Sequence, residues 1–226
     1  MAPLVKHDTD LWSTEYELAW QGGLVPIPVR MTIIRLPDGD LILHSPAPLP
    51  ETLRADLDGL GRVGFIVIPW AHGAFARQAG QVYPEARLLA APQASRRRRE
   101  IGFHATVADH APESWSGLVE THLVRGFRTN EVVLFHRPSG TLVVTDLCFN
   151  IHESRSATAR LFFRANGMWR RFGPSRLIRN LAVSDIVALE RSLEQIMHWE
   201  FERILPGHGR VVEQGGRAAL RAAWFP

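Results

Sequence analysis

The sequence Val63-Gly-Phe-Ile-Val-Ile-Pro-Trp-Ala-His-Gly-Ala-Phe75 decides the fold. Its apolar run Phe65–Ile68 is too short for a stable helix and rich in β-branched side chains, which predicts a strand buried on both faces of a sheet. Pro69 has no N–H to donate and ends the strand. The chain then exposes His72 on a glycine-containing loop before a predicted helix over Ala74–Tyr83. Loops that follow buried strands are where α/β proteins place functional side chains.

Hydrophobic patterns on both sides of this stretch predict further strands and helices. The predicted strands are Val29–Leu36, Leu41–His44, Ala86–Ala91, Leu118–Leu123, Glu131–His136, Thr141–Thr145 and Arg203–Leu205. One helix is predicted to run from Pro50 through about Leu60. A later helix is predicted to be capped by Ser184, and its core-facing stripe comprises Ile186, Leu189, Leu193, Ile196 and Met197.

The segment Leu11–Trp20 fits either a helical face or an edge strand. Its large aromatic residues, Trp12, Tyr16 and Trp20, recur every four residues. They form either a cover over the core or a binding platform.

Composition restricts the class of protein. With 226 residues, 46% of them hydrophobic and 22% charged, the chain can build one sizeable core, so we expect a single domain over 1–226. The single cysteine, Cys148, excludes an internal disulfide and is expected to be buried. No apolar run approaches the roughly 20 residues that span a bilayer, and the N-terminus lacks the apolar core of a signal peptide. We therefore expect a cytoplasmic protein without membrane contact.

Three motifs, taken in order, resemble the signature of the metallo-β-lactamase superfamily. That superfamily follows a buried strand with a loop written Thr-His-x-His-x-Asp-His, to which Pro69–Phe75 corresponds. Thr141–Asp146 is similar to its strand ending in Gly-Asp, and Ile204–Gly209 to its terminal Pro-Gly-His-Gly. Within the superfamily, the chain is similar to the metal-poor proteins that carry the DUF4336 domain. The resemblance implies an αββα four-layer sandwich, with two mixed β-sheets flanked by helices and a cleft along one edge.

The resemblance also implies which residues stand at the metal-ligand positions. Of the polar positions, this chain keeps His72, Asp146 and His208, which are therefore the candidate pocket residues. The other ligand positions hold apolar residues: Trp70, Ala74, Phe75 and Phe127. Because Ala74 replaces the carboxylate that orients or deprotonates the attacking water, no residue is assigned as catalytic. The dinuclear centre is predicted to be mostly lost and no metal is assigned. The alternative is one Zn, Fe or Mn ion on the three surviving residues.

Each surviving residue also has a structural interpretation. Asp146, at a strand end, can accept backbone N–H bonds and fix its loop. His208, between two glycines, is expected on a tight exposed turn. The remaining histidines of interest are expected at the surface or in local hydrogen bonds: His44, His104, His110, His122, His136 and His152.

Residues 150–180 have the least regular hydrophobic pattern in the chain. We interpret them as an insertion rich in arginine and aromatic residues. The arginines are Arg155, Arg160, Arg164, Arg170, Arg171, Arg176 and Arg179, and the aromatic residues are Phe162, Phe163, Trp169 and Phe172. Long excursions of this kind are often lids or interaction surfaces. We expect the aromatic residues to be buried against the sandwich or a second subunit of a homodimer. We expect the arginines near the cleft mouth, where they would favour an anionic ligand.

Three functions remain open. The first is a protein whose metal centre is mostly lost and which binds either a small ligand or a protein partner. The arginines of residues 150–180 favour an anionic ligand in this case. The second is a divergent hydrolase with a single metal or none. The third is nucleic-acid binding through residues 150–180, where arginines pair with phosphates and aromatic rings stack on bases. A formal net charge of only +3 argues against the third. No substrate is assigned.

Overall fold

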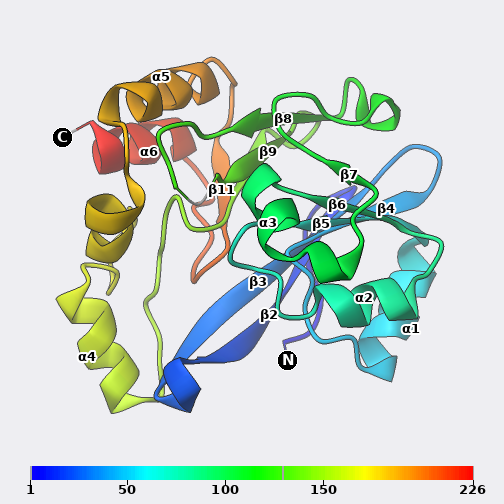
Figure 1. Ribbon diagram of the computed structural model, residues 1–226, viewed down its shortest axis with the longest axis horizontal. Helices are drawn as coiled ribbons and strands as arrows, with labels where there is room; N and C mark the ends of the chain where they lie inside the picture. The colour runs from blue at the N-terminus through cyan, green and yellow to red at the C-terminus, as the bar shows by residue number, and fades with distance from the viewer. Residues whose placement is uncertain (1, 129, 226) are drawn as a thin grey trace.

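The computed structural model describes residues 2–128 and 130–225, which form two β-sheets with helices outside them (Figure 1). The larger sheet has its strands in chain order: β1 (Val5–Asp8), β2 (Leu11–Trp20), β3 (Val25–Arg35), β4 (Asp40–His44), β5 (Arg62–Ile68), β6 (Arg87–Ala90) and β7 (Ala105–Thr106). Strands β1 to β4 pair antiparallel, and β4 to β7 pair in parallel. Parallel neighbours need crossover connections, which contain α1 (Glu51–Leu60), α2 (Ala76–Val82) and α3 (Pro92–Arg97).

The smaller sheet has the spatial order β11 (Arg203–Pro206), β10 (Thr141–Val144), β9 (Val132–His136) and β8 (Val119–Leu123). Here β10 pairs with β11 in parallel, and the other neighbours pair antiparallel. Helices α5 (Ile186–Ile196) and α6 (Gly216–Trp224) cover its outer face, while α1 to α3 lie on the larger sheet (Figure 1). The expected αββα sandwich of two mixed sheets is confirmed.

Alternation along the strands divides the core into layers. In β9 and β10, Leu134 and Val143 belong to the apolar cluster shared with the larger sheet, whereas Phe135 and Leu142 belong to the cluster beneath α5 and α6. Successive side chains of a strand point to opposite faces, so a strand covered on both faces is apolar throughout. The central strand β5 follows the same rule, since its six residues after Arg62 are all buried.

The segment Leu11–Trp20 is a strand, β2, which pairs with β3 along its whole length. A spacing of four residues keeps side chains on one face of a helix and equally on one face of a strand, which is why the aromatic pattern fitted both. Trp12 and Tyr16 are buried, while Trp20, near the tip of the hairpin, is 38% exposed.

The predicted start of α5 is wrong by one residue. Asp185 is its N-cap, and the Asp185 carboxylate accepts a hydrogen bond from the backbone N–H of Ala188 (3.0 Å). The Ser184 hydroxyl instead donates to the Gly126 carbonyl oxygen. Ile186 is 55% exposed and does not join the core-facing stripe, whose other members are buried.

Residues 150–180 contain more regular structure than the sequence indicated. Helix α4 (Ala157–Ala165) is capped by the Ser156 hydroxyl and lies beside the β2–β3 hairpin (Figure 1). A π-helical turn follows at Ile178–Ala182. Helix α6 was not predicted. None of the helices in 2–128 and 130–225 combines the length and the apolar character needed to cross a lipid bilayer.

Candidate functional site

Three loops that follow strands bring His72, Asp146 and His208 together. They come after β5, β10 and β11, and the parallel pairing of β10 with β11 places two of the loops side by side. The two histidine Nε2 atoms lie 3.1 Å apart, and the Asp146 Oδ1 atom lies 3.4 Å from His208 Nε2 and 3.9 Å from His72 Nε2. Within the described residues this is the one cluster of three or more His, Cys, Asp or Glu side chains close enough to share a metal ion.

The orientation of His208 is set by the opposite sheet. Its Nδ1 lies 2.7 Å from the carbonyl oxygen of Pro28 in β3. A carbonyl oxygen only accepts hydrogen bonds, so Nδ1 carries a proton and Nε2 is the ring nitrogen that faces the cluster. The ring of Phe149 stacks on the His208 imidazole at 4.8 Å and 7°. Both contacts restrict the ring to one position.

A buried arginine holds the His208 loop from beneath. The guanidinium of Arg30 donates to the carbonyl oxygens of Pro206 and Gly209, on either side of His208, and pairs with the carboxylate of Glu15. The backbone N–H of Arg30 donates to Gly207 (2.8 Å). Burial lowers the pKa of Arg30, and the Glu15 carboxylate opposes this shift. The charge is thus retained by pairing.

His72 is oriented by Ser45, at the end of β4. The Ser45 Oγ lies 2.7 Å from His72 Nδ1, which leaves Nε2 directed at His208 and Asp146. The backbone of Ser45 has a φ of 61°, in the left-handed region that residues other than glycine rarely adopt. This strained conformation at the end of β4 accompanies the contact with His72.

Two glycines allow the His208 loop to approach its neighbours closely. A Cβ atom at Gly207 would lie 2.9 Å from Cε1 of His72 and 3.0 Å from the Cα of Thr145. At Gly209, which has a φ of 89°, a Cβ atom would lie 2.3 Å from the carbonyl oxygen of Asn150. The Gly-His-Gly sequence is therefore required by packing, and His208 is buried rather than exposed as its glycines suggested.

Burial and mutual contact determine the charges in the cluster. Burial opposes ionisation of Asp146, but the contacts with His208 and His72 outweigh it and hold the pKa of this carboxyl well below its usual range. Burial lowers the pKa of His72 even though Asp146 acts in the opposite direction. The cluster near neutral pH therefore contains an ionised carboxylate beside a neutral His72.

A second carboxyl group, Glu131, lies beneath the Asp146 loop and was not singled out by the sequence. Its Oε1 accepts a hydrogen bond from the backbone N–H of Thr145, and its Oε2 is buried with no hydrogen-bond partner within the described parts of the chain. Burial, together with the charge of Asp146, raises the pKa of Glu131 to about 8. Glu131 is thus a buried, mostly protonated acid behind the cluster.

The cluster lies at the base of a cleft with a volume of about 240 Å³. One wall comes from the β2–β3 hairpin and another from residues 150–180. The lining residues are Tyr16, Leu18, Trp20, Ile27, Val29, Trp70, Ala71, His72, Ala74, Asp146, Phe149, Phe162, Met168, Ser175, Leu177, Ile178 and His208. The cleft is therefore largely apolar above a polar base.

The apolar residues at ligand positions have different surroundings. Trp70 and Ala74 line the cleft. Phe75 packs edge-on against Tyr16, and Phe127 is buried against Trp224, so neither belongs to the lining. None of these four side chains can coordinate a metal ion.

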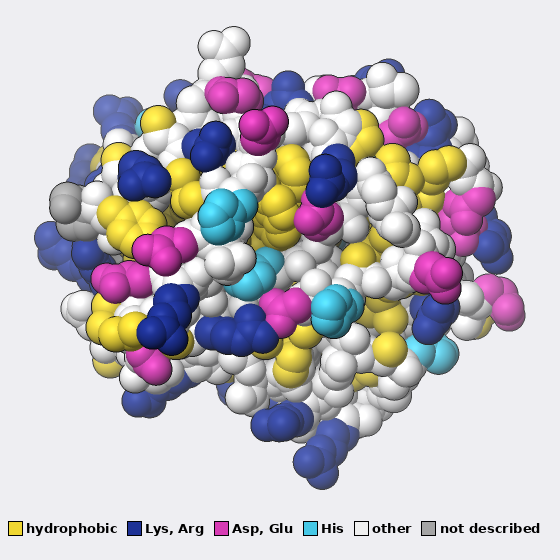
Figure 2. All heavy atoms as spheres, turned by 90° about the horizontal axis from the view of Figure 1, so that it is seen from above, with side chains coloured by type: hydrophobic (Ala, Val, Ile, Leu, Met, Phe, Trp, Pro, Cys, Tyr) yellow, Lys and Arg dark blue, Asp and Glu magenta, His cyan; other side chains and the backbone are white. Residues whose placement is uncertain are grey.

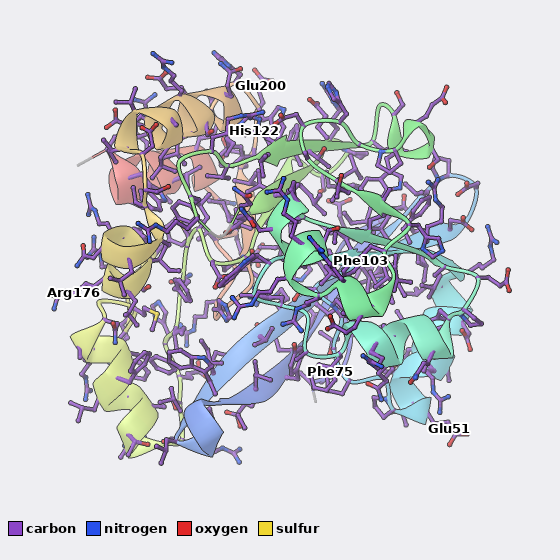
Figure 3. The ribbon with its side chains drawn as sticks, in the orientation of Figure 1. Glu51, Phe75, Phe103, His122, Arg176 and Glu200 are labelled. Carbon is purple, nitrogen blue, oxygen red and sulfur yellow. The ribbon has the colours of Figure 1, made fainter. Side chains whose placement is uncertain are left out.

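The arginines of residues 150–180 do not gather at this cleft. Arg155, Arg160 and Arg170 line a separate surface hollow, and Arg176 lies at the outer edge of the molecule (Figure 3). The aromatic residues of this segment are at least half-buried, as expected for packing against the sandwich. On the face shown in Figure 2, basic and acidic side chains alternate without a continuous basic surface.

Several residues near the site differ from their sequence-based descriptions. His72 is buried, whereas the glycine-containing loop suggested exposure. His44 was expected at the surface or in local hydrogen bonds, but it is buried beside His72, its Nε2 has no partner among the described residues, and burial lowers its pKa to about 3. His136 is also buried, although its Nδ1 does contact the nearby Ser139 hydroxyl. Cys148 is buried as expected.

The partners of the three site residues were not visible in the sequence. Ser45, Pro28 and Arg30 are far in sequence from the histidines they support, Glu131 is 14 residues from Thr145 in the Asp146 loop, and no short motif contains these residues.

Comparison with known proteins agrees with this architecture. The family described as "Domain of unknown function (DUF4336)" matches residues 9–169, which is more than half of the chain. A search of curated proteins found no match.

Similar solved structures are metallo-β-lactamases. The enzyme from Pontibacter korlensis shares 13% identity at a TM-score of 0.66, covering 99% of this chain and 97% of that one. The enzyme from Hirschia baltica shares 14% identity at a TM-score of 0.64, covering 99% and 96%. FIM-1 from Pseudomonas aeruginosa, in its mono-zinc form, shares 13% identity at a TM-score of 0.63, covering 99% and 96%. Identities this low show a common fold and nothing about activity. The chain belongs to the DUF4336 family, and its fold is that of the metallo-β-lactamases.

Proposed function

We propose that His72, Asp146 and His208 bind a single divalent cation and that the protein is a one-metal hydrolase acting on a small ligand. The observation that carries this proposal is the convergence of two imidazole nitrogens and one carboxylate oxygen within 4.8 Å of one another. Zinc ligands at bond lengths of about 2.1 Å around a tetrahedron are separated by about 3.4 Å. The separations of 3.1, 3.4 and 3.9 Å are close to that value.

The protonation of the cluster favours a cation. With its Nδ1 proton donated to Pro28, the neutral form of His208 has its lone pair on Nε2, directed inward. The same inward lone pair arises at His72 when its Nδ1–H donates to Ser45. Two lone pairs and an ionised carboxylate then converge, and a positive charge between them removes their mutual repulsion.

The donor set also limits the chemistry. A cation bound by two histidines and one carboxylate would polarise a carbonyl or phosphoryl oxygen and lower the pKa of a water molecule that it binds. Asp146 is the one acidic residue among the described lining residues of the cleft. The chain therefore supplies no separate carboxylate base there, in agreement with Ala74 at the position of the family's aspartate. The mono-zinc form of FIM-1 is a precedent for one zinc ion in a protein of this fold.

A second candidate is a metal-free binding protein in which the dinuclear centre has been lost. The observation that favours it is the direct contact between the two Nε2 atoms at 3.1 Å, which is a hydrogen-bond distance. If His72 carries its proton on Nε2, it donates to His208, and the pair is satisfied without a cation. In that state the cleft would bind a ligand or a partner without catalysing a reaction.

Metal analysis separates these candidates. We expect the full chain, purified without chelators or affinity-tag metals, to contain up to one equivalent of Zn, Fe or Mn by elemental analysis. After removal of metal with EDTA, calorimetric titration with Zn²⁺ should show one site. The substitution His208→Gln should abolish this binding, and His110→Gln, at an exposed histidine, should not. Zinc-dependent hydrolysis across a panel of esters, lost in His208→Gln, would support the hydrolase. Two bound equivalents would overturn the one-metal proposal, and no zinc binding would favour the metal-free protein.

A further inference from the structure

The walls of the cleft above the cluster are apolar and come from three separate segments. The β2–β3 hairpin contributes Leu18, Trp20, Ile27 and Val29. The segment after β10 contributes Phe149, Phe162, Met168, Leu177 and Ile178. The loop after β5 contributes Trp70, Ala71 and Ala74. Away from the base, the polar side chains of the lining are the neutral groups of Tyr16, Ser175 and the indole N–H groups of Trp20 and Trp70. The Ser175 hydroxyl already accepts a hydrogen bond from the backbone N–H of Ile178 (3.0 Å).

The charged residues of the described lining disfavour an anionic ligand. No lysine or arginine occurs among the cleft residues that the structure describes. A carboxylate or phosphate placed against these walls would find no lysine or arginine side chain to pair with, and near the base it would approach the acidic side chain of Asp146. An unpaired charge in apolar surroundings is strongly disfavoured. The arginines that suggested an anionic ligand line a different hollow or lie at the outer surface.

The same substitutions that remove metal ligands also create the apolar wall. Trp70 and Ala74 stand where the resemblance expects a histidine and an aspartate, and both line the cleft. Trp70 is also in contact with Arg97, whose guanidinium lies 5.0 Å from the ring centroid. This contact on the outside of the cleft restrains the Trp70 ring. The position where the resemblance would place a second cation is therefore bordered by the apolar side chains of Trp70 and Ala74.

We propose that the cleft binds a small uncharged molecule with an apolar body and one carbonyl-type oxygen, such as a neutral ester, with the oxygen directed at the cation that His72, Asp146 and His208 would hold. A volume of about 240 Å³ lies just below the usual range of ligand pockets, which indicates a small ligand. The direction of the oxygen and the fate of the bound ester rest on the one-metal function proposed above. Binding itself depends on the apolar walls and on the absence of charge on the ligand.

The test compares two ligands with the same carbon skeleton, methyl 4-phenylbutanoate and 4-phenylbutanoate. The full chain is treated with EDTA, so that the carboxylate cannot gain affinity by ligating a metal ion. Binding is followed by quenching of tryptophan fluorescence, since Trp20 and Trp70 line the cleft, and by calorimetry. We expect the methyl ester to bind at least about tenfold more tightly than the carboxylate, because the charged form loses its hydration without gaining a partner.

Matched variants locate the binding. Leu177 lines the cleft and is 37% exposed, whereas Leu181 lies in the π-helical turn nearby, is 65% exposed and does not line the cleft. Leu177→Glu should weaken binding of the ester about tenfold or more, and Leu181→Glu should leave it unchanged. Both sites are at the surface, so both variants are expected to fold, which circular dichroism checks. Ala74→Trp, which fills the cleft from an exposed position, should also block the ester.

Each outcome bears on one proposal alone. Tighter binding of the carboxylate than of the ester in EDTA-treated protein would overturn the uncharged ligand, whatever the metal content. Equal effects of Leu177→Glu and Leu181→Glu would overturn the assignment to this cleft. A protein that binds the ester but no zinc would retain this inference and lose the one-metal hydrolase. A protein that binds zinc but not the ester would do the reverse.

Discussion

His208 donates a hydrogen bond from Nδ1 to the carbonyl oxygen of Pro28, which precedes it by 180 residues. The contact joins a loop of the smaller sheet to strand β3 of the larger sheet. It fixes the tautomer of a candidate metal ligand through a backbone group, which no side-chain substitution at Pro28 removes. The site is therefore assembled across the interface between the sheets, and substitutions that loosen this interface should loosen the site.

Arg30 provides one such substitution. Replacing it as Arg30→Met removes donors to Pro206 and Gly209 and leaves the Glu15 carboxylate without its partner. The Glu15 side chain is 39% exposed, so its carboxylate stays hydrated, and the main cost is the loss of the hydrogen bonds that the buried guanidinium donates, about 1–3 kcal/mol. We expect a loss of that order in urea unfolding together with weaker zinc binding. Arg137→Met is the control, because Arg137 and its partner Glu120 have side chains that are 54% and 34% exposed and such pairs contribute about 0–1 kcal/mol. Equal losses in the two variants would contradict the structural role of Arg30.

Gly207 provides a second test, because its neighbour is a site residue. In Gly207→Ala, the new Cβ atom would lie 2.9 Å from Cε1 of His72 and 3.0 Å from the Cα of Thr145. We expect a destabilisation of about 1–3 kcal/mol from overpacking, and a loss of zinc affinity as His72 is displaced. Gly59→Ala is the matched control, since a Cβ there meets nothing within 4 Å. Within helix α1, that change should stabilise by about 0.5–1 kcal/mol. An unchanged zinc affinity in Gly207→Ala would show that His72 does not need this packing.

Ser45→Ala tests the orientation of His72. The substitution removes the Oγ atom 2.7 Å from His72 Nδ1, and alanine tolerates the φ of 61° no better than serine, so the backbone strain is similar. Loss of such a supporting hydrogen bond typically lowers metal affinity about 10–100-fold. We expect a decrease of this size in zinc titration of Ser45→Ala and none in Ser116→Ala, at an exposed serine. If Ser45→Ala keeps the full zinc affinity, the serine does not position His72.

Glu131 predicts an unusual dependence of stability on pH. Its pKa rises from 4.5 to about 8 on folding, so between these values the folded chain retains a proton that the unfolded chain has lost. The free energy of unfolding therefore falls as pH rises through this window, by at most about 1.4 kcal/mol per pKa unit. Below about pH 6.5 the buried histidines act in the opposite direction, because their lowered pKa values leave the unfolded chain with more protons.

The measurement is urea unfolding between pH 7 and 9, above the ordinary histidine pKa of about 6.5 at which the unfolded chain gains protons. The original chain should lose stability with rising pH, and Glu131→Gln should show a smaller slope and a higher stability at pH 9. Glu85→Gln, at an exposed glutamate, should follow the original chain. Identical slopes for Glu131→Gln and the original chain would mean that Glu131 is ionised in the folded protein.

The sequence alone determined the order and the type of most elements. The apolar run in β5 and the turn at Asp38–Gly39 depend on local physics, since burial on two faces requires apolar residues throughout and hairpin turns require glycine. The three motifs after β5, β10 and β11 also identified His72, Asp146 and His208, through their resemblance to the signature of the metallo-β-lactamase superfamily. Their use of a metal ion stays a prediction.

The tertiary structure alone decided how these residues are held and what surrounds them. The partners Pro28, Arg30 and Ser45 act through a carbonyl group, a buried charge and a hydroxyl, none of which leaves a periodic pattern in the chain. Burial of His72 and His208 arises from packing between segments more than 100 residues apart, whereas their flanking glycines suggested exposure. The apolar cleft likewise combines the β2–β3 hairpin with residues 150–180. These residues are far apart in the sequence, so their contact could not be predicted from it. The sequence predicted arginines at the cleft, whereas the folded chain lines it with apolar side chains.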